Sequence, residues 1–235
     1  MVNFAKITEF SLDADLAYLT GVIIGDGNIS NYHRTLPPTD EIDPRIFIET
    51  GDRTFLNEKV KPIIEKIHSR RKCKIFERKA RKETRNSTWV ISFRSKYFHR
   101  FLTEELGLPK GKKAEAVSIS KIIDKTKGST ELRKQLIAGI FDTDGGLRGQ
   151  SIGQCTASKK LRDDLVELLK EQGIHARAYE WTNKKYNKKY YEWKIKKHAT
   201  IKEFLDKIPL RNTNRLNKIM DRFPAIQKQG AGGEI

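Results

Sequence analysis

The sequence has few of the residues that build covalent or metal-bound frameworks. Only two of its 235 residues are cysteines, Cys73 and Cys155, and they lie far apart. A disulfide framework is therefore not expected, and a reducing, intracellular setting fits. The five histidines show no ligand spacing, which argues against a zinc site. The chain also lacks glycine-rich phosphate loops of the GxGxxG or P-loop type, so ATP-driven function is not expected.

Long apolar runs are missing as well. No stretch approaches the roughly 18 apolar residues that cross a membrane, and Met1 to Phe10 lacks the basic-then-apolar layout of a signal peptide. We therefore expect no membrane partner and no secretion, but a location in the cytoplasm of a prokaryote or in an organelle. The apolar fraction of 37% is enough for a core, and the length suits one large domain or two of about 100–120 residues.

Positive charge, by contrast, is abundant. Lys and Arg number 47 against 30 Asp and Glu, which gives a formal net charge of +17, and the basic residues run along the whole chain. This balance favours a polyanionic partner, above all a nucleic acid. The plain alternative is a soluble protein with solvated lysine faces. An anionic membrane surface is less favoured, because no basic amphipathic helix with an apolar face stands alone.

The chain repeats itself. Residues Leu16 to Gly27 read LAYLTGVIIGDG, residues Leu136 to Gly146 read LIAGIFDTDGG, and the aspartates Asp26 and Asp144 are 118 positions apart. Each apolar helical run is followed by matching extended and helical segments, so each half reads helix, two strands, helix, two strands, helix. The first half is longer, chiefly through a predicted loop at Asn31–Pro44. We therefore predict an α+β fold of two pseudo-symmetric αββαββα repeats.

The expected boundaries are an N-terminal repeat at 1–109, a lysine-rich linker at 110–130, a C-terminal repeat at 131–225 and a disordered tail at 226–235. The segments TWVISFRS and YYEWKIKK alternate apolar and polar residues, which predicts antiparallel sheets with one packed and one open face. Two basic open faces would form one long saddle for a duplex. The predicted contact residues are Arg45, Lys72, Lys74, Arg78, Ser92, Arg94, Arg177, Tyr179, Lys194 and Lys196. For each the alternative is plain solvation, and for Tyr179 and Trp181 it is packing in the core.

Small residues mark one face of each motif helix. Gly21 and Gly25 are four apart and share a helix face, although each Gly costs about 1 kcal/mol of helix stability relative to Ala. Two glycines on one face indicate that another backbone approaches there. Gly139 and Thr143 fill the same places in the second copy. We therefore predict two helices packed side by side, with Gly21 and Gly139 at their interface and both motif aspartates carried to the same end.

A pair of carboxylates at that end is unfavourable without a partner. Asp26 and Asp144 would repel each other, and the helix dipole disfavours anions at a helix C-terminus. A divalent cation removes the repulsion, and hard oxygen ligands suit Mg²⁺. A bound metal lowers the pKa of water and stabilises a leaving oxygen. The sequence therefore predicts a metal centre, and the alternative is two unrelated Asp caps in duplicated helices.

These residues carry a family resemblance. Leu19–Gly27 and Ile137–Gly145 resemble the two motifs of the double-motif LAGLIDADG homing endonucleases, and the resemblance extends from about Asp15 to Phe223. It implies that the acids at the eighth motif position, Asp26 and Asp144, bind the metal. It also implies that the preceding residues offer backbone carbonyls to it, here Gly25 and Thr143.

The motif copies differ at the sixth position, where Ile24 replaces the acid and Asp142 retains it. That position is not the catalytic one in the family, so we interpret Asp142 as a structural or surface acid. Residues that complete the site vary in the family. Counting along the chain suggests Gln154, with Thr50 as its first-half partner, and the basic residues Lys113 (or Lys112) and Arg211. For Gln154 the alternative is a base contact, and for Lys113 a phosphate contact. Because a threonine is no base at neutral pH, the two half-sites are expected to differ.

The resemblance implies a site-specific double-strand DNA endonuclease that acts as a monomer. It would bind DNA on saddle-shaped sheets, use Mg²⁺ with Mn²⁺ able to replace it, and cut a long asymmetric target across the minor groove to leave 3′ overhangs. The alternative is a binding protein of the same fold, either an RNA-binding intron maturase or a non-catalytic DNA-binding regulator. Inteins also carry this domain. The chain starts with Met1 and has no room for a splicing domain, so we expect an intron-encoded product, with intron RNA as a possible second partner.

Overall fold

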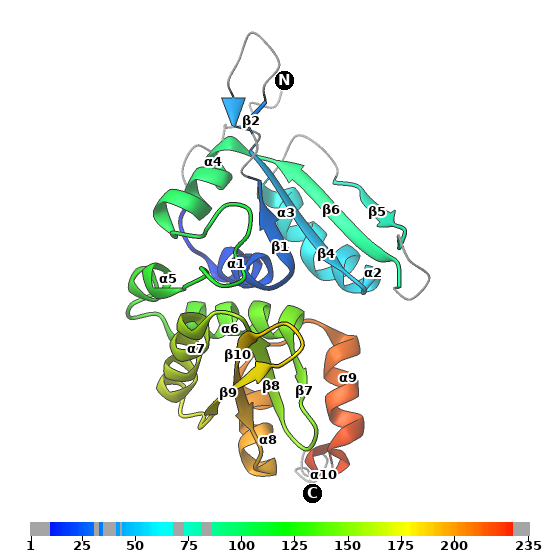
Figure 1. Ribbon diagram of the computed structural model, residues 1–235, viewed down its shortest axis with the longest axis vertical. Helices are drawn as coiled ribbons and strands as arrows, with labels where there is room; N and C mark the ends of the chain where they lie inside the picture. The colour runs from blue at the N-terminus through cyan, green and yellow to red at the C-terminus, as the bar shows by residue number, and fades with distance from the viewer. Residues whose placement is uncertain are drawn as a thin grey trace, which may run out of the picture.

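The computed structural model describes residues 10–30, 33–34, 41–42, 44–67, 73–80 and 86–227. Figure 1 shows two halves stacked along the long axis of the molecule. The first half contains α1 (Ala14–Asp26), β1 (Gly27–Ile29), β2 (His33–Arg34), β3 (Glu41–Ile42), β4 (Arg45–Thr50), α2 (Arg53–Phe55), the π-helical turn η1 (Leu56–Val60), α3 (Lys61–Ile67), β5 (Ile75–Arg78), β6 (Thr88–Arg94), α4 (Lys96–Arg100) and η2 (Phe101–Glu105).

The second half repeats this order. It contains α6 (Thr130–Asp144), β7 (Gly145–Leu147), β8 (Ile152–Thr156), α7 (Lys159–Glu171), β9 (Arg177–Asn183), β10 (Lys188–Ile195) and α8 (His198–Lys207). Between the halves lies α5 (Ser120–Lys125), and after the second half come α9 (Thr213–Arg222) and α10 (Pro224–Gln227). No helix in the described ranges is long and apolar enough to cross a bilayer.

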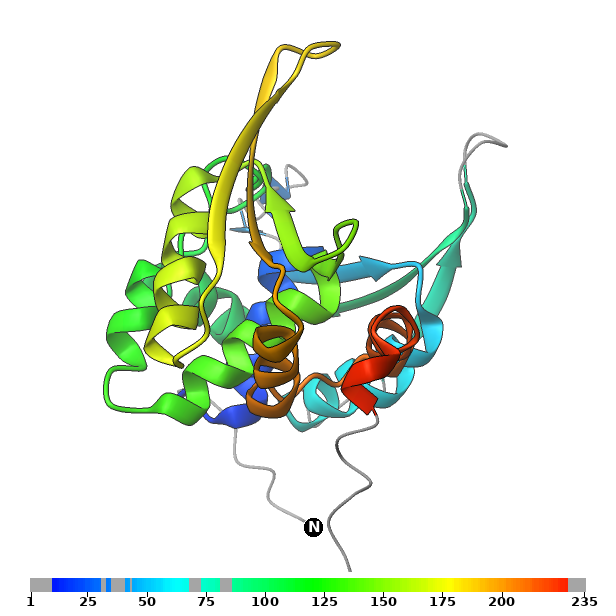
Figure 2. The ribbon, with the colours of Figure 1, turned by 90° about the horizontal axis from the view of Figure 1, so that it is seen from below.

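Each half forms a four-stranded antiparallel sheet, in the order β1-β4-β6-β5 and β7-β8-β10-β9. The predicted α+β fold of two αββαββα repeats is confirmed. Figure 2 shows the two sheets rising as arms from the central helices α1 and α6, with the β9–β10 hairpin and the β5–β6 pair as the longest projections. The molecule is therefore a saddle whose concave side lies between the arms.

The helices α1 and α6 form the centre of the molecule. Their starts are set by side-chain caps, because Asp13 accepts a hydrogen bond from the Leu16 amide at 2.7 Å and Ser129 accepts one from the Leu132 amide at 3.3 Å. They run in the same direction and touch at the predicted glycines. A Cβ on Gly21 or Gly139 would overlap a backbone carbonyl of the opposite helix. Close packing here brings both C-termini to one place.

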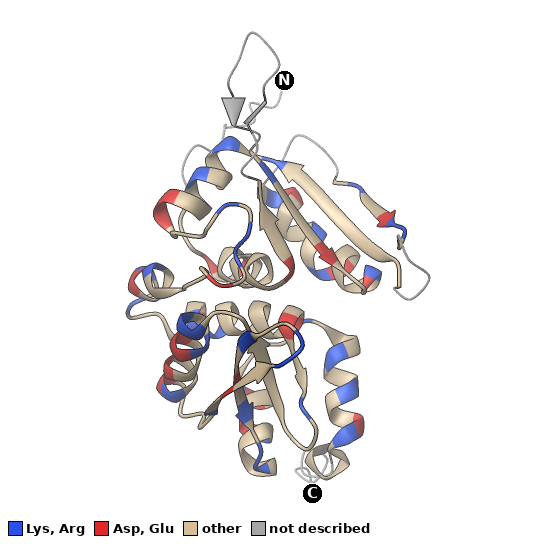
Figure 3. Ribbon diagram, in the orientation of Figure 1, with Lys and Arg blue, Asp and Glu red and all other residues tan. Residues whose placement is uncertain are grey.

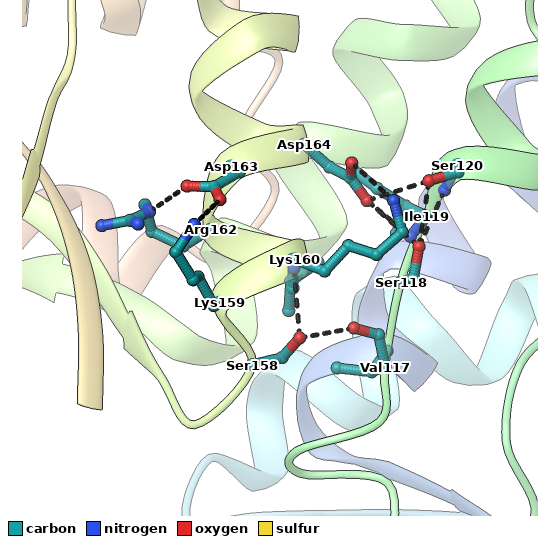
Figure 4. Close-up of polar contacts among 11 residues, drawn as sticks. Val117, Ser118, Ile119, Ser120, Ser158, Lys159, Lys160, Arg162, Asp163 and Asp164 are labelled. Carbon is teal, nitrogen blue, oxygen red and sulfur yellow. Dashed lines mark hydrogen bonds and ion pairs between the residues drawn. The ribbon is translucent and has the colours of Figure 1, made fainter. Parts of the chain in front are cut away.

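The segment at 110–130 is a docked element and not a free linker. Val117, Ile119 and Ile122 are buried. The Asp164 carboxylate on α7 accepts hydrogen bonds from the Ile119 amide at 3.1 Å and from the hydroxyls of Ser118 and Ser120 (Figure 4). This joint fixes the connection onto the second repeat.

The strands have the predicted packed faces. Ile91 and Phe93 of β6, and Trp193 and Ile195 of β10, are buried in the core. The core-packing interpretation of Tyr179 and Trp181 is wrong. The Tyr179 ring lies on the open face, with the ammonium groups of Lys194 and Lys196 at 5.4 and 5.2 Å from its centroid. The Trp181 ring is 43% exposed and stacks on Tyr190 at 4.9 Å. These aromatic side chains belong to the concave surface because β9 pairs with β10 in that register.

Candidate metal centre and nucleic-acid interface

Asp26 and Asp144 are the last residues of α1 and α6, and both are half-buried. A Cβ on Gly25 would overlap the Thr143 hydroxyl and would lie 3.5 Å from the carboxyl carbon of Asp144. The absence of a side chain at Gly25 is thus what lets the two helix ends meet. The predicted pairing of the two acids at one end follows from this contact.

Burial dominates the electrostatics of the pair. The pKa of Asp26 is raised from its usual 3.8 to about 7, mainly by burial and also by the nearby charge of Asp144, against the opposing effects of Arg215 and Lys113. Burial also raises the pKa of Asp144, while Lys113 and Arg215 act to lower it. Both carboxylates therefore favour a cation between them.

Lys113 occupies the position that the sequence predicted, beside the acids. Its ammonium group donates hydrogen bonds to the carbonyls of Ile23, Ile24 and Gly25 at 2.5, 2.6 and 2.8 Å. These carbonyls lie in the last turn of α1, where the Ile23 carbonyl also accepts the backbone amide of Gly27. Burial lowers the pKa of Lys113 to about 8, although the charges of Asp144 and Asp26 favour its protonated form.

Arg211 does not reach the acids, contrary to the prediction. Its guanidinium donates to Asp15 at 2.9 Å and to Gln135 at 2.7 Å, and it lies 4.1 Å over the Tyr18 ring, towards the start of α1. The physical reason is Asp142, whose carboxylate accepts the backbone amide of Arg211 at 2.6 Å and fixes the chain there.

Arg215 takes the place that was assigned to Arg211. Its Nη2 donates to the carbonyl of Thr143 at 2.7 Å, just as Lys113 binds the carbonyl of Gly25. Counting residues along the chain after the second repeat suggested Arg211 for this place and therefore missed Arg215. The available signal was Asn212, which caps α9 by accepting from the Arg215 amide at 3.0 Å and so places this arginine in the first turn.

The carbonyls of Gly25 and Thr143 were predicted as metal ligands, and each already accepts a hydrogen bond from a basic side chain. A carbonyl oxygen has two lone pairs, so one remains for a metal. Asp142 is a buried structural acid, as predicted, and not a surface one. It accepts the Tyr18 hydroxyl at 2.6 Å, besides backbone amides of the chain that follows α8.

Gln154 lies beside Asp144 and acts to lower its pKa. Its Oε1 accepts from the Trp193 indole at 3.2 Å, and its Nε2 has no hydrogen-bond partner among the described residues. Thr50 acts to lower the pKa of Asp26 through a side-chain hydrogen bond. It is nevertheless not the counterpart of Gln154.

Sheet register identifies the true counterpart. Gln154 pairs with Gly145, and the residue that pairs with the equivalent Gly27 is Ile48. The predicted pairing with Thr50 is therefore wrong by two residues, because the loop in the first half obscured the count. At this position the Asp144 side has the amide of Gln154, whereas the Asp26 side has the buried aliphatic side chain of Ile48.

The acid pair fits a divalent cation. Across the described residues no three His, Cys, Asp or Glu side chains gather. Two carboxylates and a few carbonyls are the sparse oxygen set that suits Mg²⁺, which keeps several of its waters. Burial raises the pKa of both carboxyl groups, and a bound cation would favour their charged forms.

The predicted duplex contacts lie on the strands of the two arms, and Figure 3 shows Lys and Arg along them. Arg45 and Arg94 are cross-strand partners in the first sheet, and so are Arg177 and Lys194 in the second. The structure places Lys74, Arg78 and Ser92 on β5 and β6 or directly before them, and Tyr179 and Lys196 on or directly after the strands of the second sheet; Lys72 lies outside the described residues.

Some of these cations are compensated within the protein. Arg78 forms an ion pair with Glu49 and lies 5.8 Å over the Phe47 ring. Lys194 forms an ion pair with Glu192 at 2.8 Å. The positive charge of Arg78 and Lys194 is therefore partly offset by acids on the same sheets.

Comparison with known proteins agrees with this fold. Residues 131–209 match the family model described as LAGLIDADG-like domain. The second repeat therefore contains a LAGLIDADG-like domain, in agreement with the resemblance of its motif, and the fold of both repeats matches a solved homing endonuclease.

Among solved structures, the homing endonuclease I-DmoI in complex with DNA and Mn is similar with a TM-score of 0.60 and 16% identity. The match covers 83% of this chain and 96% of that one. The N-terminal LAGLIDADG domain of DUF199/WhiA is similar with a TM-score of 0.54 and 14% identity, over 94% and 90% of the two chains. At these identities the likeness concerns the fold alone.

A curated relative is the replication factor C small subunit of Methanocaldococcus jannaschii. It is 32% identical over 221 residues, which are 93% of this chain and 11% of that protein. The chain thus spans about a tenth of the length of this relative. The same domain occurs in proteins with different names, so the fold by itself does not assign a reaction.

Proposed function

We propose that the chain is a site-specific DNA endonuclease that hydrolyses one phosphodiester in each strand of a duplex, with Asp26 and Asp144 in one shared centre. The observation that carries the proposal is this pair of half-buried carboxylates, held together at the floor of a basic saddle. I-DmoI, which has the same fold, was solved with DNA and Mn and with DNA and Ca. A long asymmetric target, a cut across the minor groove and 3′ overhangs are part of the proposal, as is action as a monomer, because both repeats lie in one chain.

Asp26 and Asp144 would hold Mg²⁺, or Mn²⁺ in its place. Bound there, the ion supplies Lewis acidity that activates water and stabilises the leaving 3′ oxygen. The basic side chains of Lys113 and Arg215 offset charge that develops on the phosphate. The side-chain amide of Gln154, beside Asp144, would help to orient the attacking water on that side.

The test uses a library of randomised duplexes incubated with the protein and Mg²⁺, followed by sequencing of all cleaved ends. We expect one enriched target with 3′ overhangs, and no cleavage by Asp26→Asn or Asp144→Asn. Enrichment of a bound but uncut sequence by the wild type would overturn the nuclease assignment. Full cutting by Asp144→Asn would overturn the site.

A second candidate is a nucleic-acid-binding protein without cleavage, either a regulator of DNA or a maturase on intron RNA. One observation favours it. Lys113 and Arg215 already hold the helix ends beside the acids, so the pair is partly compensated without any metal. Tight binding of duplex or RNA by both wild type and Asp26→Asn, with no cut ends, would select this candidate.

A further inference from the structure

A cleft of about 850 Å³ lies next to the paired acids. One wall is the β4–α2 corner, Thr50–Thr54, together with Trp89 of β6. The other wall is the segment Gly145–Arg148 at β7, and α9 completes the lining. The cleft adjoins both acids, because Thr50 bonds to Asp26 and Gly145 follows Asp144.

Positive charge dominates this cleft. Four cations line it, Arg53, Arg148, Arg215 and Lys218, against the acids Asp52 and Asp221. Asp52 is occupied, since it caps α2 through the Phe55 amide at 3.0 Å and accepts from Asn214 at 2.9 Å. The Arg148 guanidinium is 3.8 Å from Glu192 of β10, outside the cleft. The described residues therefore leave a net positive lining.

Two arginine Nε donors in the lining form no hydrogen bond, although the Nε of Arg148 lies 3.8 Å from a carboxylate oxygen of Glu192. The Nε atoms of Arg148 and Arg215 are buried and form no hydrogen bond with any described residue. A buried donor left unsatisfied costs about 1–3 kcal/mol, and more when it is charged. Two such guanidinium groups in one cleft are explained by an anion that binds there, since arginine forks match the oxygens of a phosphate.

The cleft also breaks the pseudo-symmetry of the molecule. After the second repeat the chain forms α9, which reaches across to the first repeat through the bond between Asn214 and Asp52. After the first repeat the equivalent chain is the segment docked on α7 by Asp164. The lining supplied by α9 is thus found on one side of the acid pair.

We propose that this cleft binds a backbone phosphate of one DNA strand, next to the position where the acids act. The proposal rests on the proposed function for its partner, a nucleic acid duplex. The guanidinium groups of Arg148 and Arg215 are the inner contacts, and Arg53 and Lys218 are the outer ones. The site holds one strand and leaves the other to the opposite side, so it orients the duplex in the saddle.

The first test is the salt dependence of binding to a short duplex without divalent ions. Loss of one phosphate contact lowers the slope of log affinity against log salt by about 0.9. We expect this change for Lys218→Ala and for Arg53→Ala, and no change for Arg222→Ala. The control removes the same charge from the exposed end of α9, outside the cleft. Slopes for both cleft variants that equal the control would overturn the proposal.

The second test observes the arginine Nε–H resonances by NMR, assigned with Arg148→Lys and Arg215→Lys. Both resonances are expected to shift when the duplex is added, and to shift much less with inorganic phosphate alone. Equal shifts with inorganic phosphate would assign the cleft to a free anion and overturn the strand assignment. If the wild type shows no salt-dependent duplex binding at all, the proposed function fails. If the wild type binds the duplex but the Nε–H resonances of Arg148 and Arg215 do not shift, the cleft proposal alone fails.

Discussion

At the scale of single residues, Asp26 and Asp144 are placed where their charge is least tolerated. Each is half-buried, each is at the C-terminus of a helix, and each faces the other. Without a bound cation, burial of the two charged carboxylates lowers the free energy of unfolding. This makes the protonation of Asp26 a direct readout of the centre.

Stability should therefore fall as pH rises, when no metal is present. The pKa of Asp26 is raised to about 7, so the folded state keeps a proton that the unfolded state loses above its usual 3.8. The stabilising contribution is present below that value and is lost as pH rises through about 7. We expect the melting temperature in EDTA to drop between about pH 5 and pH 8, and Asp26→Asn to flatten the drop. Mg²⁺ should restore the wild type at the higher pH and leave Asp26→Asn unchanged.

Two arginines four residues apart should have opposite phenotypes. Arg211→Ala removes bonds to Asp15 and Gln135, so it should lower the free energy of unfolding by about 1–2 kcal/mol and leave cleavage intact at low temperature. Arg215→Ala should reduce cleavage by on the order of 10²-fold, as loss of a donor to developing charge does. Two measurements separate these phenotypes. Cleavage of the duplex recovered from the library reports on activity, and unfolding in urea reports on stability. Equal cleavage by both variants would contradict the placement of Arg215.

At the scale of elements, the contact between α1 and α6 leaves no room for a side chain. A Cβ on Gly139 would overlap the carbonyl of Tyr18, while a Cβ on Gly51 would meet nothing within 4 Å. Gly139→Ala should therefore lower the free energy of unfolding by about 3 kcal/mol or more. Gly51→Ala, the matched control, should change it by less than about 0.5 kcal/mol. Denaturant unfolding measures both, and a similar value for the two would refute the packing.

The joint between α5 and α7 is a second element-scale feature. Asp164 binds the Ile119 amide and two serine hydroxyls, while its neighbour Asp163 pairs with Lys159 on the exposed side of the helix. Asp164→Ala leaves the buried amide without a partner, so it should cost about 1–3 kcal/mol. Hydrogen exchange at Ile119 should become faster in Asp164→Ala and stay slow in Asp163→Ala. Unchanged protection in both variants would show that the segment is held by its apolar side chains alone.

At the scale of the whole molecule, the two half-sites are unequal. Gln154 stands beside Asp144, whereas the equivalent residue in the first half is Ile48 and Asp26 has only the hydroxyl of Thr50 nearby. One strand should therefore be cut faster, and a nicked duplex should accumulate before the double-strand break. Gln154→Leu should slow the faster strand by at least about tenfold and leave the slower one unchanged. Gel analysis of a supercoiled plasmid that carries the recovered target measures both rates, and equal rates in the wild type would contradict this asymmetry.

The internal repeat made the sheets, the helix contact and the acid pair predictable from sequence. Each depends on residues that recur at matching places, such as Gly21 and Gly139. The features that the sequence did not predict depend on contacts that only one half possesses. Arg211 was misplaced because Asp142 has no acid counterpart, and Ile48 was missed because an insertion hid the register. The helix α9 carries an apolar pattern at Leu216, Ile219 and Met220, but it lies after the second repeat and was not used to place Arg215.

The hydrogen bond between Tyr18 and Asp142 has a consequence for the ancestry of the chain. The offset of 118 that relates the two aspartates also relates Tyr18 to Leu136 and Ile24 to Asp142. The pair Tyr18 and Asp142 is therefore polar, whereas the pseudo-symmetric pair Leu136 and Ile24 is aliphatic. Two copies of the second repeat would set each Asp142 against Leu136, a buried carboxylate without its hydroxyl. At this contact each half is therefore complementary to the other half and not to a copy of itself. A homodimer of the second repeat alone is therefore expected to be less stable than the contact between the two halves of this chain.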